Sequence, residues 1–263
     1  MQDILKKVHV HMPFDLLARY QEMILQKKMN LEIYFSHGVL NKLNIAQCRE
    51  TAKLLADSGL KITFHAPFMD LRPGALDDKI RRASIDRIKQ VFDLIPYFQP
   101  LKIVCHPSFD RLYYVSCDEE WLEASTATWL ALIALIDGET KTQIALENVY
   151  EQEPSVLRKL FERLDSERIC FCFDTGHFNV FAHTKLQVWL DELGKYLGHL
   201  HLHDNYGERD EHLPVGNGTF PFAGFFEKLR EIQASPTITL EAHAEDNLWE
   251  SLGNIKKMGI LES

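Results

Sequence analysis

The sequence predicts a single α/β domain over residues 1–263, folded as a closed (β/α)8 barrel of the TIM type. Short β-branched or apolar runs alternate with longer helix-like stretches, a pattern typical of parallel βαβ units. Eight such pairs in 263 residues favour a closed barrel over an open sheet. No Gly-x-Gly-x-x-Gly follows the first run, and no linker-like stretch divides the chain.

Eight strands are predicted, each five or six residues long. In chain order they are residues 8–12, 31–35, 61–66, 102–106, 143–148, 169–174, 198–203 and 237–242. Between them, apolar residues at three- and four-residue spacing predict helices, most clearly in 80–95, 122–136, 157–164 and 225–232. Pro154 and Pro221 precede the last two, where proline suits the first turn of a helix.

Alternation along each strand predicts which side chains fill the barrel. Residues two positions before a strand-end side chain share its face and should point inward. Most of these residues are small or of moderate size, as a crowded interior requires. They are Thr63, Val104, Ala145, Cys172, His199 and Thr239.

Composition narrows the class of protein. A hydrophobic fraction of 46% with 25% charged residues is ordinary for a soluble globular chain, and no apolar stretch is long enough to span a bilayer. The net charge of −9 disfavours non-specific binding to nucleic acid or to acidic membranes. An odd number of cysteines, five, and the lack of a signal peptide indicate reduced thiols and a cytoplasmic location. The oligomeric state is not predicted.

Metal-competent side chains stand at the ends of six consecutive predicted strands. In a parallel barrel these ends converge on one mouth, so residues far apart in sequence should meet there. Imidazoles with carboxylates suit zinc, manganese, iron or cobalt, and the lack of thiolate ligands argues against a structural zinc site. The residues are His65, His106, Glu147, Asp174, His201 and Glu241.

Further candidates lie in the loops that follow strands six and seven. His177 follows Asp174 across a glycine-containing turn, and Asp210 and His212 are separated by one residue. We expect all three to be metal ligands. His203 is expected to contact the substrate or to support a ligand. His11 is a weaker substrate candidate.

These motifs recur, in this order, in a known superfamily. The chain resembles the xylose isomerase-like barrels, which include sugar isomerases, sugar epimerases and endonuclease IV, the abasic-site DNA repair enzyme of AP endonuclease family 2. The similarity extends from the first strand to Glu241. The motifs are His65-Ala-Pro, His106-Pro, Glu147-Asn, Asp174-Thr-Gly-His177, His201-Leu-His203-Asp204, Asp210-Glu-His212 and the final Glu241.

The resemblance implies three ligand groups and one to three divalent ions. His65, His106 and Glu147 form the first group, and His177, Asp210 and His212 form the third. The second contains Asp174, His201 and Glu241 together with Glu147, which bridges two groups. In the isomerases and epimerases only the second group is kept, and its two glutamates also exchange protons with the sugar. That implies catalytic roles for Glu147 and Glu241.

Two reaction types compete. Complete occupancy of the nine ligand positions favours a phosphodiesterase acting on abasic DNA. Three differences from endonuclease IV favour a small sugar or sugar phosphate as the substrate. The loop after strand three carries Phe68 but lacks the asparagine of endonuclease IV. The loops of the mouth hold four Lys or Arg against fifteen Asp or Glu, whereas DNA binders surround their site with cations. The third difference is the motif Asp-x-His-Leu-Pro-x-Gly-x-Gly after strand seven, which resembles the sequences of the sugar phosphate isomerase/epimerase branch.

We therefore expect a metal-dependent sugar isomerase or epimerase. Arg72, Arg111 and Arg209 are the basic candidates for binding a substrate phosphate, and Phe68 is a further candidate for substrate contact. The abasic-site nuclease is the alternative. A non-catalytic carbohydrate- or metal-binding barrel is the third hypothesis.

Overall fold

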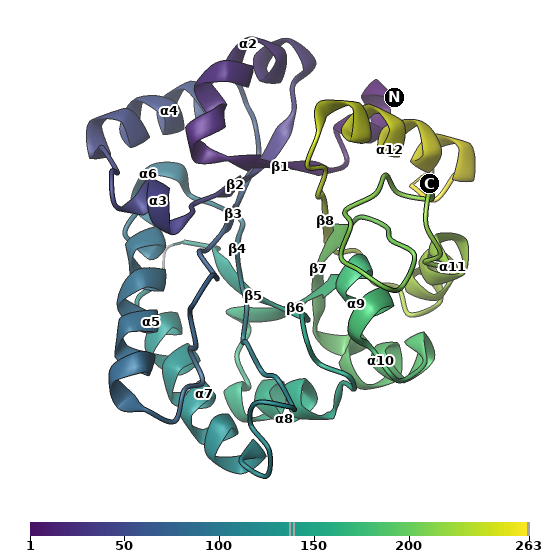
Figure 1. Cartoon of the computed structure of the whole chain (residues 1–263). Helices are drawn as coiled ribbons and strands as arrows, with labels where there is room; N and C mark the ends of the chain where they lie inside the picture. The colour runs from purple at the N-terminus through teal and green to yellow at the C-terminus, as the bar shows by residue number, and fades with distance from the viewer. Residues whose placement is uncertain (137, 139, 262–263) are drawn as a thin grey trace.

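The computed structural model describes residues 1–136, 138 and 140–261, and these form a closed barrel of eight parallel strands in chain order. This confirms the predicted fold. Figure 1 shows the strands as a ring with the helices outside it. The strands are β1 (His9–Pro13), β2 (Asn30–Tyr34), β3 (Ile62–His65), β4 (Lys102–Cys105), β5 (Gln143–Glu147), β6 (Ile169–Asp174), β7 (Leu197–Leu202) and β8 (Thr237–Leu240).

The helices connect successive strands around the outside of the ring. They are α1 (Gln2–Leu5), α2 (Leu17–Lys27), α3 (His37–Leu40), α4 (Ile45–Asp57), α5 (Asp78–Phe92), α6 (Ile95–Phe98), α7 (Asp118–Ile133), α8 (Ser155–Leu164), α9 (Thr175–Phe181), α10 (Leu186–Leu193), α11 (Phe222–Glu231) and α12 (Glu245–Met258). Two 3-10 turns, Phe14–Leu16 and Gly194–Tyr196, adjoin α2 and β7. Among the described residues, no helix is both long and apolar enough to cross a membrane.

Two helical predictions need correction. The stretch 80–95 is not one helix, because α5 ends at Phe92 and a separate short helix, α6, contains Pro96 near its start. Proline lacks the backbone N–H that would continue the first helix. Two residues assigned to apolar faces are largely exposed: Ile80 (50%) lies in the first turn of α5, and Ile232 (45%) lies just beyond α11.

The barrel interior is divided into an apolar and a polar part. All six residues predicted to point inward are buried. Val104, Ala145, Cys170 and Cys172 form a small apolar cluster on the β4–β6 side. Hydrogen bonds join the other part, which contains Glu32, Thr63, His199 and Thr239.

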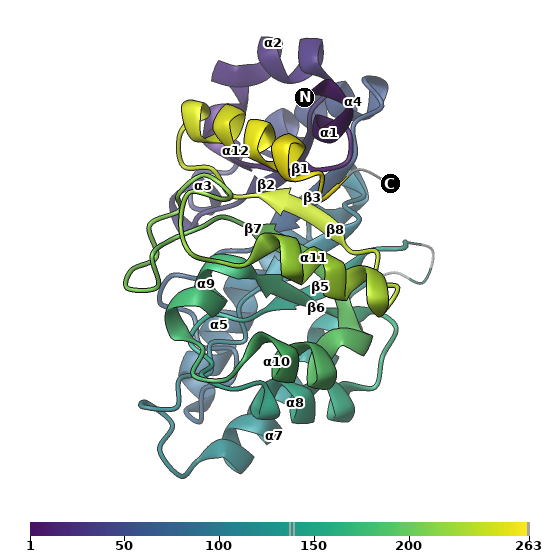
Figure 2. The ribbon, with the colours of Figure 1, turned by 90° about the vertical axis from the view of Figure 1, so that its right-hand side faces the viewer.

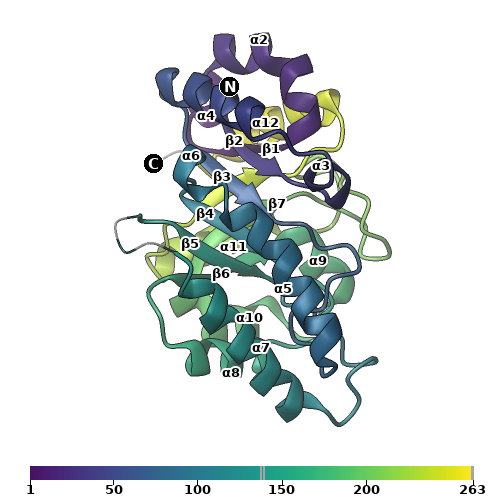
Figure 3. The same cartoon turned by 90° about the vertical axis from the view of Figure 1, so that its left-hand side faces the viewer.

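The mouth of the barrel lies at the carboxyl ends of the strands. Figure 2 shows the long loop between β7 and α11 projecting from this end, on the same side as α9. Figure 3 gives the opposite view, with α3 at the same end. The strand seams differ in length: β3–β4 and β1–β8 each have two paired positions, whereas every other seam has four or five.

Candidate metal centre

Six strands deliver the expected ligands to the mouth. His65, Glu147 and Asp174 are the last residues of β3, β5 and β6, and His201 is the fifth residue of β7. His106 and Glu241 directly follow β4 and the end of β8. All are buried except His106, which is partly exposed. The barrel therefore brings side chains from positions 65 to 241 of the sequence together in one cluster.

Glu147 joins two sets of histidines through its two oxygens. Its Oε2 lies 3.0 Å from His106 Nε2 and 3.4 Å from His65 Nε2. Its Oε1 lies 3.1 Å from His177 Nδ1 and 3.3 Å from His201 Nδ1. This is the arrangement expected of a bridging carboxylate.

The second group surrounds His201 Nδ1. This nitrogen lies 3.1 Å from Glu241 Oε1 and 3.7 Å from Asp174 Oδ2, in addition to its approach to Glu147. Three carboxylates from β5, β6 and the end of β8 therefore face one imidazole nitrogen. Burial raises the pKa of Glu241, but the nearby His201 and His11 outweigh this and lower it to about 2. The Glu241 carboxyl is thus ionised.

The third group lies farther out. His177 Nε2 is 3.5 Å from Asp210 Oδ2, and the same oxygen is 3.1 Å from His212 Nε2. His212 adopts a left-handed backbone conformation (φ 50°), which is unfavourable for a residue with a Cβ. The structure therefore brings together all three residues expected here.

The position of Asp210 and His212 depends on Asp204, a buried residue that belongs to the His201-Leu-His203-Asp204 motif but to which no role was assigned from the sequence. Asp204 Oδ1 accepts hydrogen bonds from the backbone N–H groups of Asn205 (2.9 Å) and Phe220 (3.1 Å). Its Oδ2 accepts from Gly216 (3.1 Å) and Gly218 (2.8 Å). One carboxylate thus fixes both ends of the loop that carries the third group.

The turn after β6 is fixed by contacts of the Asp174 carboxylate. Asp174 caps α9, because its Oδ1 accepts the backbone N–H of His177 at 2.6 Å. His203 Nε2 approaches the same carboxylate at 3.0 Å. A Cβ on Gly176 would lie only 1.9 Å from His203 Cε1, so the turn requires glycine there. His203 therefore packs between the second and third groups and supports Asp174.

The cluster has the properties of a cation site. Within the described part of the chain, the buried atoms His106 Nε2, Glu147 Oε2 and His201 Nδ1 have no hydrogen-bond partner despite lying close to opposite charges. Ligand atoms each about 2.1 Å from a tetrahedral ion are about 3.4 Å apart, which is close to the separations given above. The residues present therefore fit a divalent metal ion.

Proton affinities support the same conclusion. Burial by itself lowers the pKa of His177 and His201, but the surrounding acidic groups reverse this and raise both pKa values well above the ordinary range. The pKa of Glu147, raised by burial, is brought well below its usual range by His201 and His106. The site thus concentrates negative charge that protons or metal ions must balance.

The expected substrate residues divide into two sets. His11 stacks on Tyr34 and Phe68 stacks on His106, with ring centres 5.6 and 4.5 Å apart, so both lie against the cluster. The arginines are engaged elsewhere or exposed. The Arg72 guanidinium lies 4.6 Å from the centre of the Tyr113 ring, Arg111 pairs with Glu153, and Arg209 is exposed.

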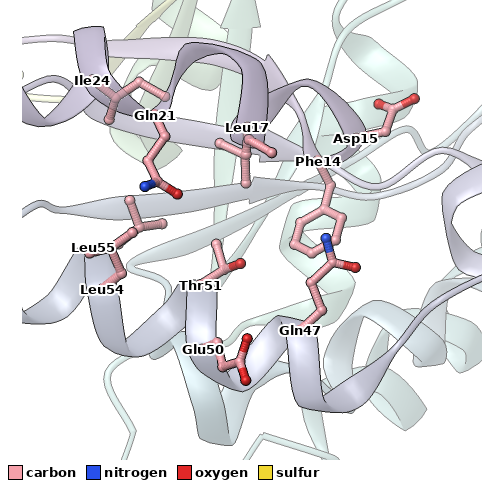
Figure 4. A pocket seen from close by; sticks show the side chains of 11 residues that line it. Phe14, Asp15, Leu17, Gln21, Ile24, Gln47, Glu50, Thr51, Leu54 and Leu55 are labelled. Carbon is pink, nitrogen blue, oxygen red and sulfur yellow. The ribbon is translucent and has the colours of Figure 1, made fainter.

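The structure has one pocket beside the cluster and another outside the barrel. A mainly apolar pocket of about 300 Å³ adjoins the cluster, lined among others by His11, Met12, Tyr20, Tyr34, His243 and Leu248. We call it the β1–β8 pocket. His243 stacks on His212 at 3.8 Å, which links this pocket to the third group. A second pocket, of about 340 Å³, lies between α2 and α4 outside the barrel (Figure 4), and its described lining contains no histidine or cysteine.

Sequence reasoning missed one buried residue of this region entirely. Glu32 lies in the middle of β2, fully buried, with Oε1 2.9 Å from His201 Nε2. The available signal was a single charged residue within the otherwise apolar run Leu31-Glu32-Ile33. Such a residue is rarely buried without partners.

Comparison of this chain with known proteins agrees with the fold. The family model described as xylose isomerase-like TIM barrel matches residues 31–258. Two uncharacterized proteins of Methanocaldococcus jannaschii are related: MJ1614 is 30% identical over 76% of this chain and 78% of its own length. MJ1311 is 29% identical over 69% of this chain, which spans 64% of that protein's length.

Solved structures with this architecture include a D-tagatose 3-epimerase-like protein, with a TM-score of 0.80, 22% identity and 95% and 97% of the two chains covered. Another is the TTHB071 protein from Thermus thermophilus soaked with ZnCl2, with a TM-score of 0.78, 21% identity and 96% and 97% coverage. At these identities the structural likeness concerns the fold. The match over residues 31–258 shows the family: this chain belongs to the xylose isomerase-like TIM barrels.

Proposed function

We propose that this protein is a divalent-metal-dependent isomerase or epimerase of a sugar or sugar-like substrate. The observation that carries the proposal is the approach of two carboxylates, Glu147 and Glu241, to the same atom, His201 Nδ1, at 3.3 and 3.1 Å. Two ionised carboxylates beside one candidate metal ligand suit proton removal and return at a carbon next to a carbonyl. Two proteins of similar fold support this class: the D-tagatose 3-epimerase-like protein and the 3-keto-D-glucoside 4-epimerase of E. coli.

Asp174, His201 and Glu241, with Glu147, would hold the principal ion, for which zinc, manganese, iron and cobalt are all suited. A bound divalent ion supplies polarisation of the substrate carbonyl, which makes the neighbouring C–H more acidic. The His65–His106 and His177–Asp210–His212 groups offer places for up to two more.

The two glutamates carry the proton transfers. Because both carboxyls are ionised at rest, one of them first takes up a proton from solvent. The ionised carboxylate then removes the proton from the substrate carbon, and the protonated one returns its proton to the substrate. The pair keeps the same total number of protons, because one residue gains what the other gives up. Their burial excludes bulk water, which would otherwise exchange with the transferred proton.

The surroundings favour a substrate without phosphate. Arg72 packs on Tyr113 and Arg111 pairs with Glu153, so both guanidinium groups already have partners, and Arg209 is exposed. The β1–β8 pocket instead offers a mainly apolar space beside His11. We therefore propose an uncharged sugar-like compound whose less polar end enters this pocket.

Endonuclease activity on abasic DNA is the second candidate. The observation in its favour is that all three ligand groups are assembled, more than an isomerase needs. The acidic loops around the mouth oppose it, since phosphodiester backbones require nearby cations.

The test combines metal analysis with two assays on the full chain. We expect a bound divalent ion and interconversion of unphosphorylated ketoses or aldoses. Glu147→Gln and Glu241→Gln should each lose at least 100-fold in kcat, whereas Glu153→Gln, a partly exposed carboxylate of the mouth that pairs with Arg111, should stay within about twofold. Incision of an abasic-site duplex that Glu147→Gln abolishes, without sugar turnover, would replace this proposal with the nuclease. Absence of metal would refute both.

A further inference from the structure

We propose that Glu32 is a positioning residue for the metal centre: it holds the His201 ring through Nε2, so that Nδ1 presents its lone pair to the cation. The role lies beneath the mouth, inside the barrel, and none of the ligand motifs in the sequence includes Glu32. It rests on the proposed metal centre, because a ligand can be positioned only where an ion binds.

Both oxygens of Glu32 have close polar contacts. Oε1 lies 2.9 Å from His201 Nε2, an ion pair that lacks the alignment of a hydrogen bond. Oε2 accepts hydrogen bonds from His199 Nε2 at 2.9 Å and from the hydroxyls of Thr63 and Thr239 at 3.1 and 2.9 Å. The carboxylate thus connects β2 with β3, β7 and β8. All five side chains are fully buried, so water does not compete for these contacts.

These contacts determine where the imidazole proton lies. An ionised carboxylate only accepts hydrogen bonds, so the facing nitrogen, Nε2 of His201, must carry a proton. When a cation displaces the second proton of the imidazolium, the neutral ring keeps its one proton on Nε2 and Nδ1 offers a free lone pair. That nitrogen is the one facing Glu147, Asp174 and Glu241.

In two other candidate ligands as well, one ring nitrogen faces a backbone carbonyl oxygen and the other faces a carboxylate of the cluster. His65 Nδ1 lies 2.8 Å from the Ala66 carbonyl oxygen while its Nε2 faces Glu147. His177 Nδ1 lies 3.1 Å from the Asn148 carbonyl oxygen and 3.1 Å from Glu147 Oε1, while its Nε2 faces Asp210. Metal-bound histidines commonly donate their other N–H in this way, and a carboxylate acceptor increases the basicity of the ligand. His201 has the charged acceptor, at the centre of the second group.

An isosteric change would break this arrangement. The amide of Glu32→Gln has one acceptor oxygen and one NH2 group, and the NH2 must face either His201 or the set formed by His199 and the threonines. If it faces His201, the favoured imidazole proton moves to Nδ1 and opposes the cation. If it faces His199, three donors lose their acceptor. The carboxylate suits both sides at once.

A competing explanation is that this interior cluster binds an ion of its own. Ligand atoms of Cys172, His199 and His201 lie within 4.8 Å of one another. We favour positioning because Glu32 already contacts His201 Nε2 and His199 Nε2 at hydrogen-bond distances. Direct ligation would give a different metal count.

The test is calorimetric titration of the metal-free full chain with Zn²⁺, with Mn²⁺ as a second probe. Glu32→Gln should weaken binding at the principal site by 10- to 100-fold and leave the number of ions unchanged. Glu22→Gln, the same change on the exposed face of α2, should stay within about twofold. A second measurement needs no variant: long-range ¹H–¹⁵N spectra of the zinc-loaded wild-type chain should show His201 with a slowly exchanging proton on Nε2.

The outcomes separate the hypotheses. Unchanged affinity in Glu32→Gln, or a proton on His201 Nδ1 in the zinc-loaded wild-type chain, would overturn the role of Glu32 and leave the metal centre intact. Loss of one whole ion in Glu32→Gln would also overturn it, in favour of direct ligation. If the wild-type chain binds neither probe, the metal centre fails and this role fails with it.

Discussion

Replacing Asp204 by asparagine tests whether one buried carboxylate holds the loop of the third ligand group. Asp204 accepts four backbone N–H groups, two on each oxygen. An asparagine amide retains one acceptor oxygen, so two of these bonds are lost in either orientation. Hydrogen bonds to charged groups contribute about 1.5–3 kcal/mol each, which gives a loss of about 3–6 kcal/mol for the loop.

The loss should appear as local opening, because the loop can detach without the barrel unfolding. At about 1.4 kcal/mol per factor of ten, amide protons of Gly218 and Phe220 should exchange at least 100-fold faster in Asp204→Asn. Any ion bound by the third group should be lost. Hydrogen exchange and metal analysis measure these effects, with Glu208→Gln, exposed in the same loop, as the control. Exchange rates within threefold of wild type would refute the reasoning.

Three further outcomes are expected. Burial raises the pKa of Glu151 from 4.5 to about 7, so the folded state holds a proton that the unfolded state releases as the pH rises through this window, and stability falls there. Glu151→Gln should therefore gain about 3 kcal/mol relative to wild type between pH 4.5 and pH 8 in urea denaturation of the metal-free chain; a pH-independent difference would contradict this. Gly176→Ala should displace His203 and weaken Zn²⁺ binding at least tenfold, whereas Gly224→Ala, where a Cβ meets nothing within 4 Å, should not. His65→Ala should remove the ion of the first group only, and loss of every ion would show that the groups do not bind independently.

The convergence of the strand-end side chains could be predicted because a parallel barrel leaves little freedom. Once eight strands are recognised, the inward-facing side chain nearest each carboxyl end lies at the mouth. The inward positions follow from alternation alone, as Thr63 and Thr239 illustrate by being fully buried. The end of α5 was harder to place, because the apolar spacing continues through residue 95 although Pro96 prevents a continuous helix.

The supporting residues could not be predicted, because their roles depend on contacts across the barrel. Glu32 and His199 are 167 positions apart, and nothing in the local sequence of either indicates the other. Asp204 looks like an ordinary turn residue until the loop returns to bring Gly216 and Gly218 against it. The neighbours of the arginines could not be predicted either: their charge is visible in the sequence, but the aromatic and acidic side chains that contact Arg72 and Arg111 are not.

Because the seam between β3 and β4 is short, an ion in the first ligand group would also help to hold these two strands together. Phe64 and His65 pair across it with Ile103 and Val104, and one backbone hydrogen bond flanks the ladder at each end. His65 belongs to one side of this seam and His106 follows the other, so an ion held by both with Glu147 would join the barrel at one of its two shortest seams. Removing the ion would then loosen this seam, visible as faster cleavage by a protease between β3 and β4. In such a protein the cofactor would determine how long the barrel stays closed as well as what it catalyses.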